Sequence, residues 1–206
     1  MDVPPIDPLT NASHASWSRV VASANPPALL VAIRRMMGPA LQSRLEADDI
    51  LQETLIHAWR DRTSCEWRGV GAFRRWLLEI ARNRIRDQAG MANAGKRGQG
   101  RERRHADLRT TLVDEVYAGP TAETTPSRLA SDREMADHMA RALDCLPDEW
   151  REVVRLRLFE ELELHEIATA LGLGVEGVRY RFRHGADAYQ RALRQSWDVG
   201  TDAPPS

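Results

Sequence analysis

The stretch ELHEIATALGLGVEGVRYRFRH, residues 163–184, predicts how the C-terminal part of this chain folds. Apolar positions recur at helical spacing on both sides of Gly172, which predicts two short helices joined by a turn. Ala168 allows the two helices to approach closely, Gly172 permits a tight turn, and Val178 holds the second helix against the first. These requirements at these spacings are typical of a helix-turn-helix. The alternative is a plain αα-hairpin with a solvated basic face.

The second of these helices presents polar and aromatic side chains on the face opposite its apolar positions. A helix-turn-helix places such a face in the major groove, where arginine reads guanine and flanking cations hold phosphates. We therefore predict a DNA-binding surface formed by Glu176, Arg179, Tyr180, Arg181, Arg183 and His184. Gly185 follows directly, and because glycine weakens a helix interior by up to about 1 kcal/mol relative to alanine, we expect the helix to end or bend there.

A second motif is the stretch FRRWLLEIARNRIRD, residues 73–87. In a helix, a step of about 100° per residue places the apolar side chains along one side; they are Phe73, Trp76, Leu77 and Ile80. The opposite side gathers Arg75, Arg82, Asn83 and Arg86. Either this is an ordinary solvated face or it faces DNA. We expect the helix to run to about Gln88.

The stretch DDILQETLIHAWR, residues 48–60, predicts a further helix. An aspartate at its start can cap the N-terminus and suits the helix dipole. The predicted buried side consists of Ile50, Leu51, Leu55, Ala58 and Trp59. The predicted exposed side is an acidic and amide surface of Asp48, Asp49, Gln52 and Glu53. Ordinary capping with a solvated face is the alternative.

The helical patterns on either side of a segment that lacks them predict an all-α fold of two small helical domains joined by a flexible linker. Between Gly90 and Ser127 no periodic apolar pattern survives; the segment is first Gly-rich and basic, then acidic with prolines. We predict the helical domains at 27–90 and 128–195 and the linker at 91–127. Residues 1–26 are expected to form a loose arm, with a short helix near Trp17 as one alternative, and residues 196–206 a disordered tail.

Charge and cysteine content limit the function classes. The formal net charge of the 206 residues is −1, whereas a protein that binds nucleic acid on its own is usually strongly basic. Cys65 and Cys145 form no CxxC motif, so we expect neither a disulfide framework nor a zinc site. No apolar run reaches membrane-spanning length and no signal pattern opens the chain. We therefore expect a cytoplasmic protein without membrane insertion, cofactor, metal or catalytic residues.

The motifs taken together resemble the bacterial RNA polymerase sigma factors, in particular the extracytoplasmic-function (ECF) group of the sigma-70 family, which keeps only regions 2 and 4. The region 2 pattern stands here as Asp48-Asp49-Ile50-Leu51-Gln52-Glu53 through Trp59, then Phe73, Trp76-Leu77, Ile80-Ala81-Arg82-Asn83-Arg84 and Asp87. The region 4 pattern stands as Leu146-Pro147, Arg151-Glu152-Val153, Leu156-Arg157, Glu166-Ile167-Ala168, Leu171-Gly172 and Glu176-Gly177-Val178. A departure is His184-Gly185, where the family usually has an Arg-Ala pair.

The resemblance implies a role for each surface. The partners would be core RNA polymerase and promoter DNA, with the clamp helices of the largest subunit and the flap as docking points, and an anti-sigma factor is a further candidate partner. Asp48, Asp49, Gln52 and Glu53 would dock on the clamp helices. Trp67, Arg75, Arg82, Asn83 and Arg86 would serve the minus-ten element and its melting. The helix-turn-helix at 163–184 would read the minus-thirty-five element.

Two other classes compete with this interpretation. One is a stand-alone helix-turn-helix repressor or activator, which would bind its promoter tightly without polymerase and leaves the acidic surface unexplained. The other is a hydrolase or metal enzyme, since His165-Glu166 superficially resembles HExxH. Thr169 stands where that motif needs its second histidine, so the enzyme interpretation is disfavoured.

Overall fold

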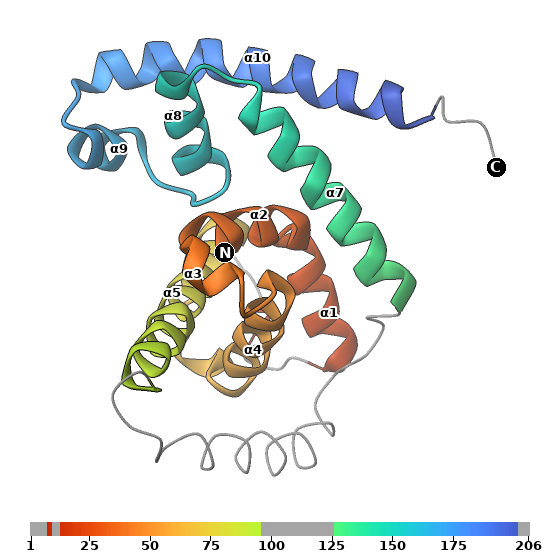
Figure 1. The fold of residues 1–206 in the computed structure, drawn as a ribbon. Helices are drawn as coiled ribbons and strands as arrows, with labels where there is room; N and C mark the ends of the chain where they lie inside the picture. The colour runs from red at the N-terminus through yellow and green to blue at the C-terminus, as the bar shows by residue number, and fades with distance from the viewer. Residues whose placement is uncertain (1–7, 10–12, 96–125, 202–206) are drawn as a thin grey trace, which may run out of the picture. The chain divides into compact units, whose positions relative to one another are not determined.

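The computed structural model describes residues 8–9, 13–95 and 126–201, and all regular secondary structure there is helical (Figure 1). Contacts between Cα atoms divide the chain into two compact units. One comprises Met1–Asn25 with Ile33–Thr125, and the other Pro26–Ala32 with Pro126–Ser206. The all-α architecture predicted from the sequence is therefore confirmed.

The first unit is built around two long helices, α4 and α5, which pack against each other. The helices in this half of the chain are α1 (His14–Ser23), α2 (Pro26–Met36), α3 (Pro39–Gln42), α4 (Ala47–Arg60), the 3-10 turn η1 (Arg62–Ser64) and α5 (Val70–Gly95). Phe73, Leu77 and Leu78 of α5 are almost fully buried, as is Ile50 of α4. Burial of these apolar faces holds α4 and α5 together.

Helix α1 replaces much of the predicted loose arm. Ser13 caps it, since the Ser13 hydroxyl accepts the Ser16 N–H at 3.2 Å. Trp17 is only 4% exposed, and its ring lies edge-on to Trp59 and Phe73 at 5.4 and 5.8 Å. The sequence allowed a short helix near Trp17, and the structure confirms that alternative; the rest of the arm, 1–7 and 10–12, lies outside the described residues.

Helix α5 is longer than predicted, and its buried stripe is rotated. It begins at Val70 and continues to Gly95, beyond the expected end at Gln88. The buried positions are Phe73, Leu77, Leu78, Ala81 and Ile85. Trp76 and Ile80, predicted to share the dry side, are half-buried at its border. The polar face opposite this stripe is nevertheless the one that the helical spacing predicted.

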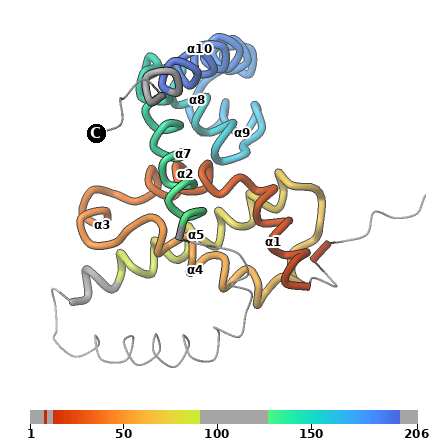
Figure 2. The backbone as a smooth tube through the Cα atoms, turned by 90° about the vertical axis from the view of Figure 1, so that its right-hand side faces the viewer, coloured from red at the N-terminus to blue at the C-terminus, as the bar shows by residue number. Residues whose placement is uncertain are grey.

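The second unit places the long helix α10 against three shorter ones. Besides Pro26–Ala32 of α2, it contains α7 (Pro126–Asp144), α8 (Asp148–Leu158), α9 (Leu164–Leu171) and α10 (Val175–Thr201). Helix α10 contacts α7, α8 and α9, and both views show α8 and α9 beneath it (Figures 1 and 2). The core of the helix-turn-helix is formed by Val153, Leu156, Ile167, Ala168 and Val178.

The turn between α9 and α10 has the geometry that the sequence predicted. Gly172 ends α9 with φ +64°, in the left-handed region that glycine enters without penalty. The Leu173 N–H donates to the Ala168 carbonyl at 2.9 Å, which closes the helix end. At the other end of α9, Glu163 and Glu166 form a capping box, with the Glu163 N–H donating to Glu166 Oε2 at 2.7 Å.

Gly185 does not end or bend α10, so that expectation was wrong. The helix runs from Val175 to Thr201 without interruption. A Cβ at Gly185 would lie 2.7 Å from Cγ2 of Val154 and 3.1 Å from Cβ of Trp150. The glycine is therefore needed for the close packing of α10 on α8, and this packing compensates for its low helix propensity.

The neighbouring helices extend into the segments predicted as linker and tail. Residues 91–95 belong to α5, residues 126–127 to α7 and residues 196–201 to α10. The remainder of both segments, 96–125 and 202–206, lies outside the described residues.

Candidate nucleic-acid interface

The first half of α10 carries exposed charged and aromatic side chains. Tyr180 is 61% exposed, and Glu176, Arg179 and Arg183 are exposed as well. Arg179 is ion-paired with Glu176 one turn earlier, on the same exposed face. Because both partners remain open to water, this pair is weak and can exchange for a DNA contact.

Two of the predicted residues lie at the border of this face. Arg181 is half-buried, and its guanidinium lies 3.5 Å from Oε2 of Glu149 in the first turn of α8. His184 is half-buried too; its ring centroid lies 4.3 Å from that of Tyr180 and 6.0 Å from that of Trp150. The sequence predicted that Arg181 flanks the face and that His184 lies on it, whereas the structure places His184 at the border as well. The contacts with α8 could not be read from the sequence.

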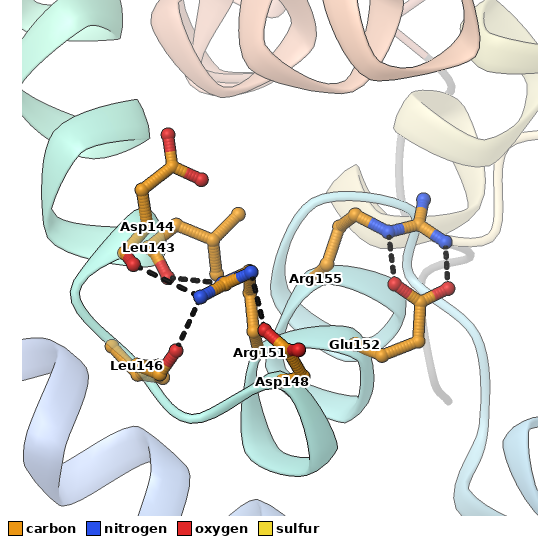
Figure 3. Close-up of polar contacts among 7 residues, drawn as sticks. All are labelled: Leu143, Asp144, Leu146, Asp148, Arg151, Glu152 and Arg155. Carbon is orange, nitrogen blue, oxygen red and sulfur yellow. Dashed lines mark hydrogen bonds and ion pairs between the residues drawn. The ribbon is translucent and has the colours of Figure 1, made fainter.

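The arginines of α8, in contrast, are engaged inside the unit. Figure 3 shows Arg151 directed at the end of α7. Its guanidinium donates to the carbonyls of Leu143, Asp144 and Leu146 at 3.3, 3.0 and 2.7 Å. It also pairs with Asp148 at 2.7 Å. Arg151 thus satisfies carbonyls at a helix end that have no partner within the helix.

Arg155 and Arg157 hold the connection between α8 and α9. Arg155 pairs with Glu152 and with Glu160, a carboxylate that is only 6% exposed. Burial opposes the charge on Arg155, but Glu152 and Glu160 outweigh it, so the pKa of this guanidinium is raised. Arg157 donates to the Leu162 carbonyl at 3.0 Å and to Glu163 at 3.2 Å. These cations stabilise the scaffold of the helix-turn-helix.

Helix α5 has a polar face of mixed charge. Asn83 and Arg86 are exposed, whereas Arg75 and Arg82 are half-buried. Arg82 is ion-paired with Glu79, which lies among the predicted basic residues and was missed by the sequence interpretation. The helical spacing does bring these side chains to one face, as predicted.

Trp67 lies in the loop that leads into α5. It is half-buried, and its ring lies 5.9 Å from that of Phe73 at an interplanar angle of 46°. Gly69 follows with φ +100°, a conformation that glycine adopts readily, and its carbonyl accepts the Phe73 N–H at 3.1 Å. The loop is therefore anchored to the first turn of α5 by one hydrogen bond and one aromatic contact.

The acidic surface of α4 differs from the prediction at Asp48. Gln52 is exposed, and Asp49 and Glu53 are half-buried, but Asp48 is only 5% exposed. The first turn of α4 is buried together with its aspartate, a position where the helix dipole favours a carboxylate. The prediction that Asp48 belongs to the exposed surface was therefore wrong.

The opposite end of α4 carries His57 close to charges of both signs. The pKa of His57 is lowered, first by burial and then by the charges of Arg84 on α5 and Arg60 on α4. Arg84 itself pairs with Asp87 at 3.2 Å. Asp61 and Glu53 act on His57 in the opposite direction, so this end of α4 combines basic and acidic side chains.

Two family models match this chain, one in each half. The model of sigma-70 region 2 matches residues 22–93, and that of sigma-70 region 4 matches residues 142–187. The RNA polymerase sigma-H factor of Pseudomonas aeruginosa is 31% identical over 153 residues, covering 72% of this chain and 74% of that protein. The chain belongs to the sigma-70 family. Proteins of this family are transcription initiation factors that direct RNA polymerase to promoters.

Other relatives place this sigma factor in the ECF group. The ECF RNA polymerase sigma factor SigL of Mycobacterium tuberculosis is 28% identical over 186 residues, covering 89% of this chain and 93% of the relative. SigE of Mycolicibacterium smegmatis, also an ECF sigma factor, is 30% identical over 141 residues. That match covers 68% of this chain and 49% of SigE, so the sigma factor described here spans about half the length of that relative.

The family models also place the observed surfaces. Region 2 includes α4, the Trp67 loop and most of α5, and region 4 includes α8, α9 and the exposed half of α10. The enzyme interpretation finds no support at His165, which is exposed, because the neighbouring Glu166 is used in the cap of α9. Within the described residues, no helix is both long enough and apolar enough to cross a membrane.

Proposed function

We propose that this sigma factor binds core RNA polymerase through α4 and recognises promoters at two points, the minus-ten element with α5 and the minus-thirty-five element with α10. The observation that carries the proposal is the exposed set Arg179, Tyr180 and Arg183 on the second helix of a helix-turn-helix. The arginines of α8 beside it are held by protein groups, so α10 is the helix that offers cations to DNA.

At the minus-thirty-five duplex, the first half of α10 would enter the major groove. Arginine recognises guanine through two acceptors, and an apolar ring contacts the methyl group of thymine. Arg179 and Arg183 supply the first chemistry and Tyr180 the second. Glu176, paired with Arg179, is suited either to orient that guanidinium or to accept from the amino group of cytosine.

At the minus-ten element, the polar face of α5 would bind one strand of melted DNA. Arg75, Arg82 and Arg86 would hold phosphates, and Asn83 together with Trp67 would hold an unstacked base. Unstacking costs a few kcal/mol per base, which stacking on an aromatic ring can offset. The half-buried ring of Trp67 beside Phe73 supports this assignment.

Docking on polymerase would use the acidic and amide side chains that remain accessible on α4. These are Asp49, Gln52 and Glu53, while the buried Asp48 is better suited to holding the helix start. A partner surface of basic residues, such as the clamp helices of the largest subunit, would complement them. Because core polymerase acts in the cytoplasm, we place the sigma factor there.

The division of labour between the two units can be tested by footprinting the holoenzyme on a cognate promoter. Replacing Arg179 and Arg183 by alanine should remove protection of the minus-thirty-five element and leave the reactivity of melted bases intact on promoters that retain a strong minus-ten element. Loss of melting with retained minus-thirty-five protection would contradict the assignment.

Docking can be tested by charge reversal at Asp49 and Glu53, with Asp48→Asn as the matched control. The double reversal should abolish co-purification with core polymerase, whereas the control should affect stability only. Unchanged binding of the double variant would exclude α4 as the docking helix. A stand-alone repressor would instead bind the promoter tightly without polymerase, so the same DNA fragment is also tested with the sigma factor alone.

A further inference from the structure

A series of aromatic rings connects the scaffold of the second unit to the exposed face of α10. Trp150, in the first turn of α8, is half-buried and lies nearly parallel to His184, with an interplanar angle of 28° and centroids 6.0 Å apart. His184 in turn lies 4.3 Å from Tyr180, one helical turn earlier on α10. The outermost ring, Tyr180, is 61% exposed.

The absence of a side chain at Gly185 permits this series. A Cβ there would clash with Val154 and crowd Trp150 Cβ at 3.1 Å. With glycine, α10 lies close enough to α8 for the indole of Trp150 to meet the imidazole of the preceding residue, His184. The pair His184-Gly185, which departs from the usual Arg-Ala of the family, is therefore matched to Trp150 in this chain.

An exposed tyrosine on a helix can change rotamer freely, and each ring position presents a different surface to DNA. A neighbouring ring restricts that freedom, because offset and edge-on aromatic pairs have preferred geometries. Trp150 on α8 lies against His184, and His184 lies against one side of the Tyr180 ring. The rest of the Tyr180 ring is accessible, since the residue is 61% exposed.

We propose that Tyr180 selects a thymine in the minus-thirty-five element by contact with its methyl group, and that Trp150 and His184 are positioning residues for Tyr180. The inference rests on the proposed function and names the base that this part of the surface selects. Apolar contact with the C5 methyl is the means by which a ring in the major groove distinguishes thymine from the other bases.

The test is a binding selection of holoenzyme on promoters with a randomised minus-thirty-five element, followed by sequencing. Tyr180→Ala should lower the preference for thymine at one position by about tenfold. Trp150→Leu and His184→Ala should lower the preference at that same position and leave the others unchanged. Trp150→Phe should retain most of the thymine preference, because an aromatic ring remains at position 150.

Leu162→Ala is the control for a purely structural effect, since Leu162 packs on the helix-turn-helix core outside the ring series. It should lower stability without a change in base preference. If Trp150→Leu behaves like this control, or keeps the full thymine preference, the positioning role is overturned while the proposed function stands. If Tyr180→Ala changes no position, base reading by Tyr180 is overturned, and the footprint of the Arg179 and Arg183 variant decides the proposed function separately.

Discussion

Helices α8 and α10 carry the same kind of residue in neighbouring positions of one unit, yet use it differently. Arg151, Arg155 and Arg157 of α8 bond to carbonyls and carboxylates of their own unit. Arg179 and Arg183 of α10 lie open to solvent. Both helices carry several arginines and are amphipathic in sequence, so the residue type alone does not distinguish scaffold from interface.

The difference follows from what surrounds each helix. Helix α8 lies between the end of α7 and the connection to α9, where carbonyls without helical partners and the buried Glu160 require donors. Helix α10 covers the other three helices and leaves one face free. A guanidinium with satisfied donors stabilises the fold, whereas one with open donors can bind phosphate or guanine.

The largest effect in this comparison of α8 and α10 is expected at Arg155. Arg155→Ala leaves Glu160 buried without its main cation, which typically costs about 3–5 kcal/mol. We expect the free energy of unfolding, measured by urea denaturation, to fall by that order. A double variant, Arg155→Met with Glu160→Met, removes both charges and should recover most of the loss. A single variant as stable as the wild type would mean that α8 does not depend on its cations.

A smaller loss is expected at Arg151. Arg151→Ala removes the donors of three carbonyls around the end of α7, and water can replace part of them because the site is only half-buried. We expect a loss of about 1–2 kcal/mol, which corresponds to a fall in Tm of roughly 4–16 °C for a domain of fewer than about 100 residues. Arg151→Lys keeps the charge but lacks the planar set of donors of a guanidinium, so it should recover little of the lost stability.

The sequence predicted helices and the helix-turn-helix well, because these depend on local spacing. Gly172 shows why: its left-handed φ is required by the turn itself. Long-range contacts were missed. Gly185 appeared to be a helix breaker because its partners, Val154 and Trp150, belong to another helix. Asp48 was predicted to be exposed because the pattern of one helix alone was considered, whereas in the structure it is buried.

The candidate site divides in the same way. That Arg179, Tyr180 and Arg183 share a face follows from 3.6-residue periodicity and needs no tertiary structure. That Arg181 meets Glu149, and that His184 meets Trp150, depends on how α8 packs against α10. Sequence reasoning therefore identifies the face but not its borders.

The inner face of α10 gives a third, smaller test. Tyr189 is 6% exposed, packs edge-on to Phe159 at 5.9 Å, and its hydroxyl has no hydrogen-bond partner among the described residues. Burial raises the pKa of this phenol to about 12. Tyr189→Phe removes the buried hydroxyl, so we expect unfolding to cost up to about 1 kcal/mol more. A marked loss of stability in thermal denaturation would show that the hydroxyl is bonded.

The smallest effect on stability, and the largest contrast with α8, is expected at Arg183. Since its side chain is exposed, Arg183→Ala should change the free energy of unfolding by less than about 0.5 kcal/mol. The same change should weaken holoenzyme binding to the promoter, and the slope of log K against log salt should fall by about 1 if the residue contacts a phosphate. If the slope is unchanged but binding to one base pair is weakened, Arg183 reads a base instead. If neither the slope nor the binding changes, Arg183 does not contribute to DNA binding. The functional contrast between α10 and α8 would then not extend to this residue, because an exposed guanidinium on α10 would contribute no more to DNA binding than the arginines that stabilise α8.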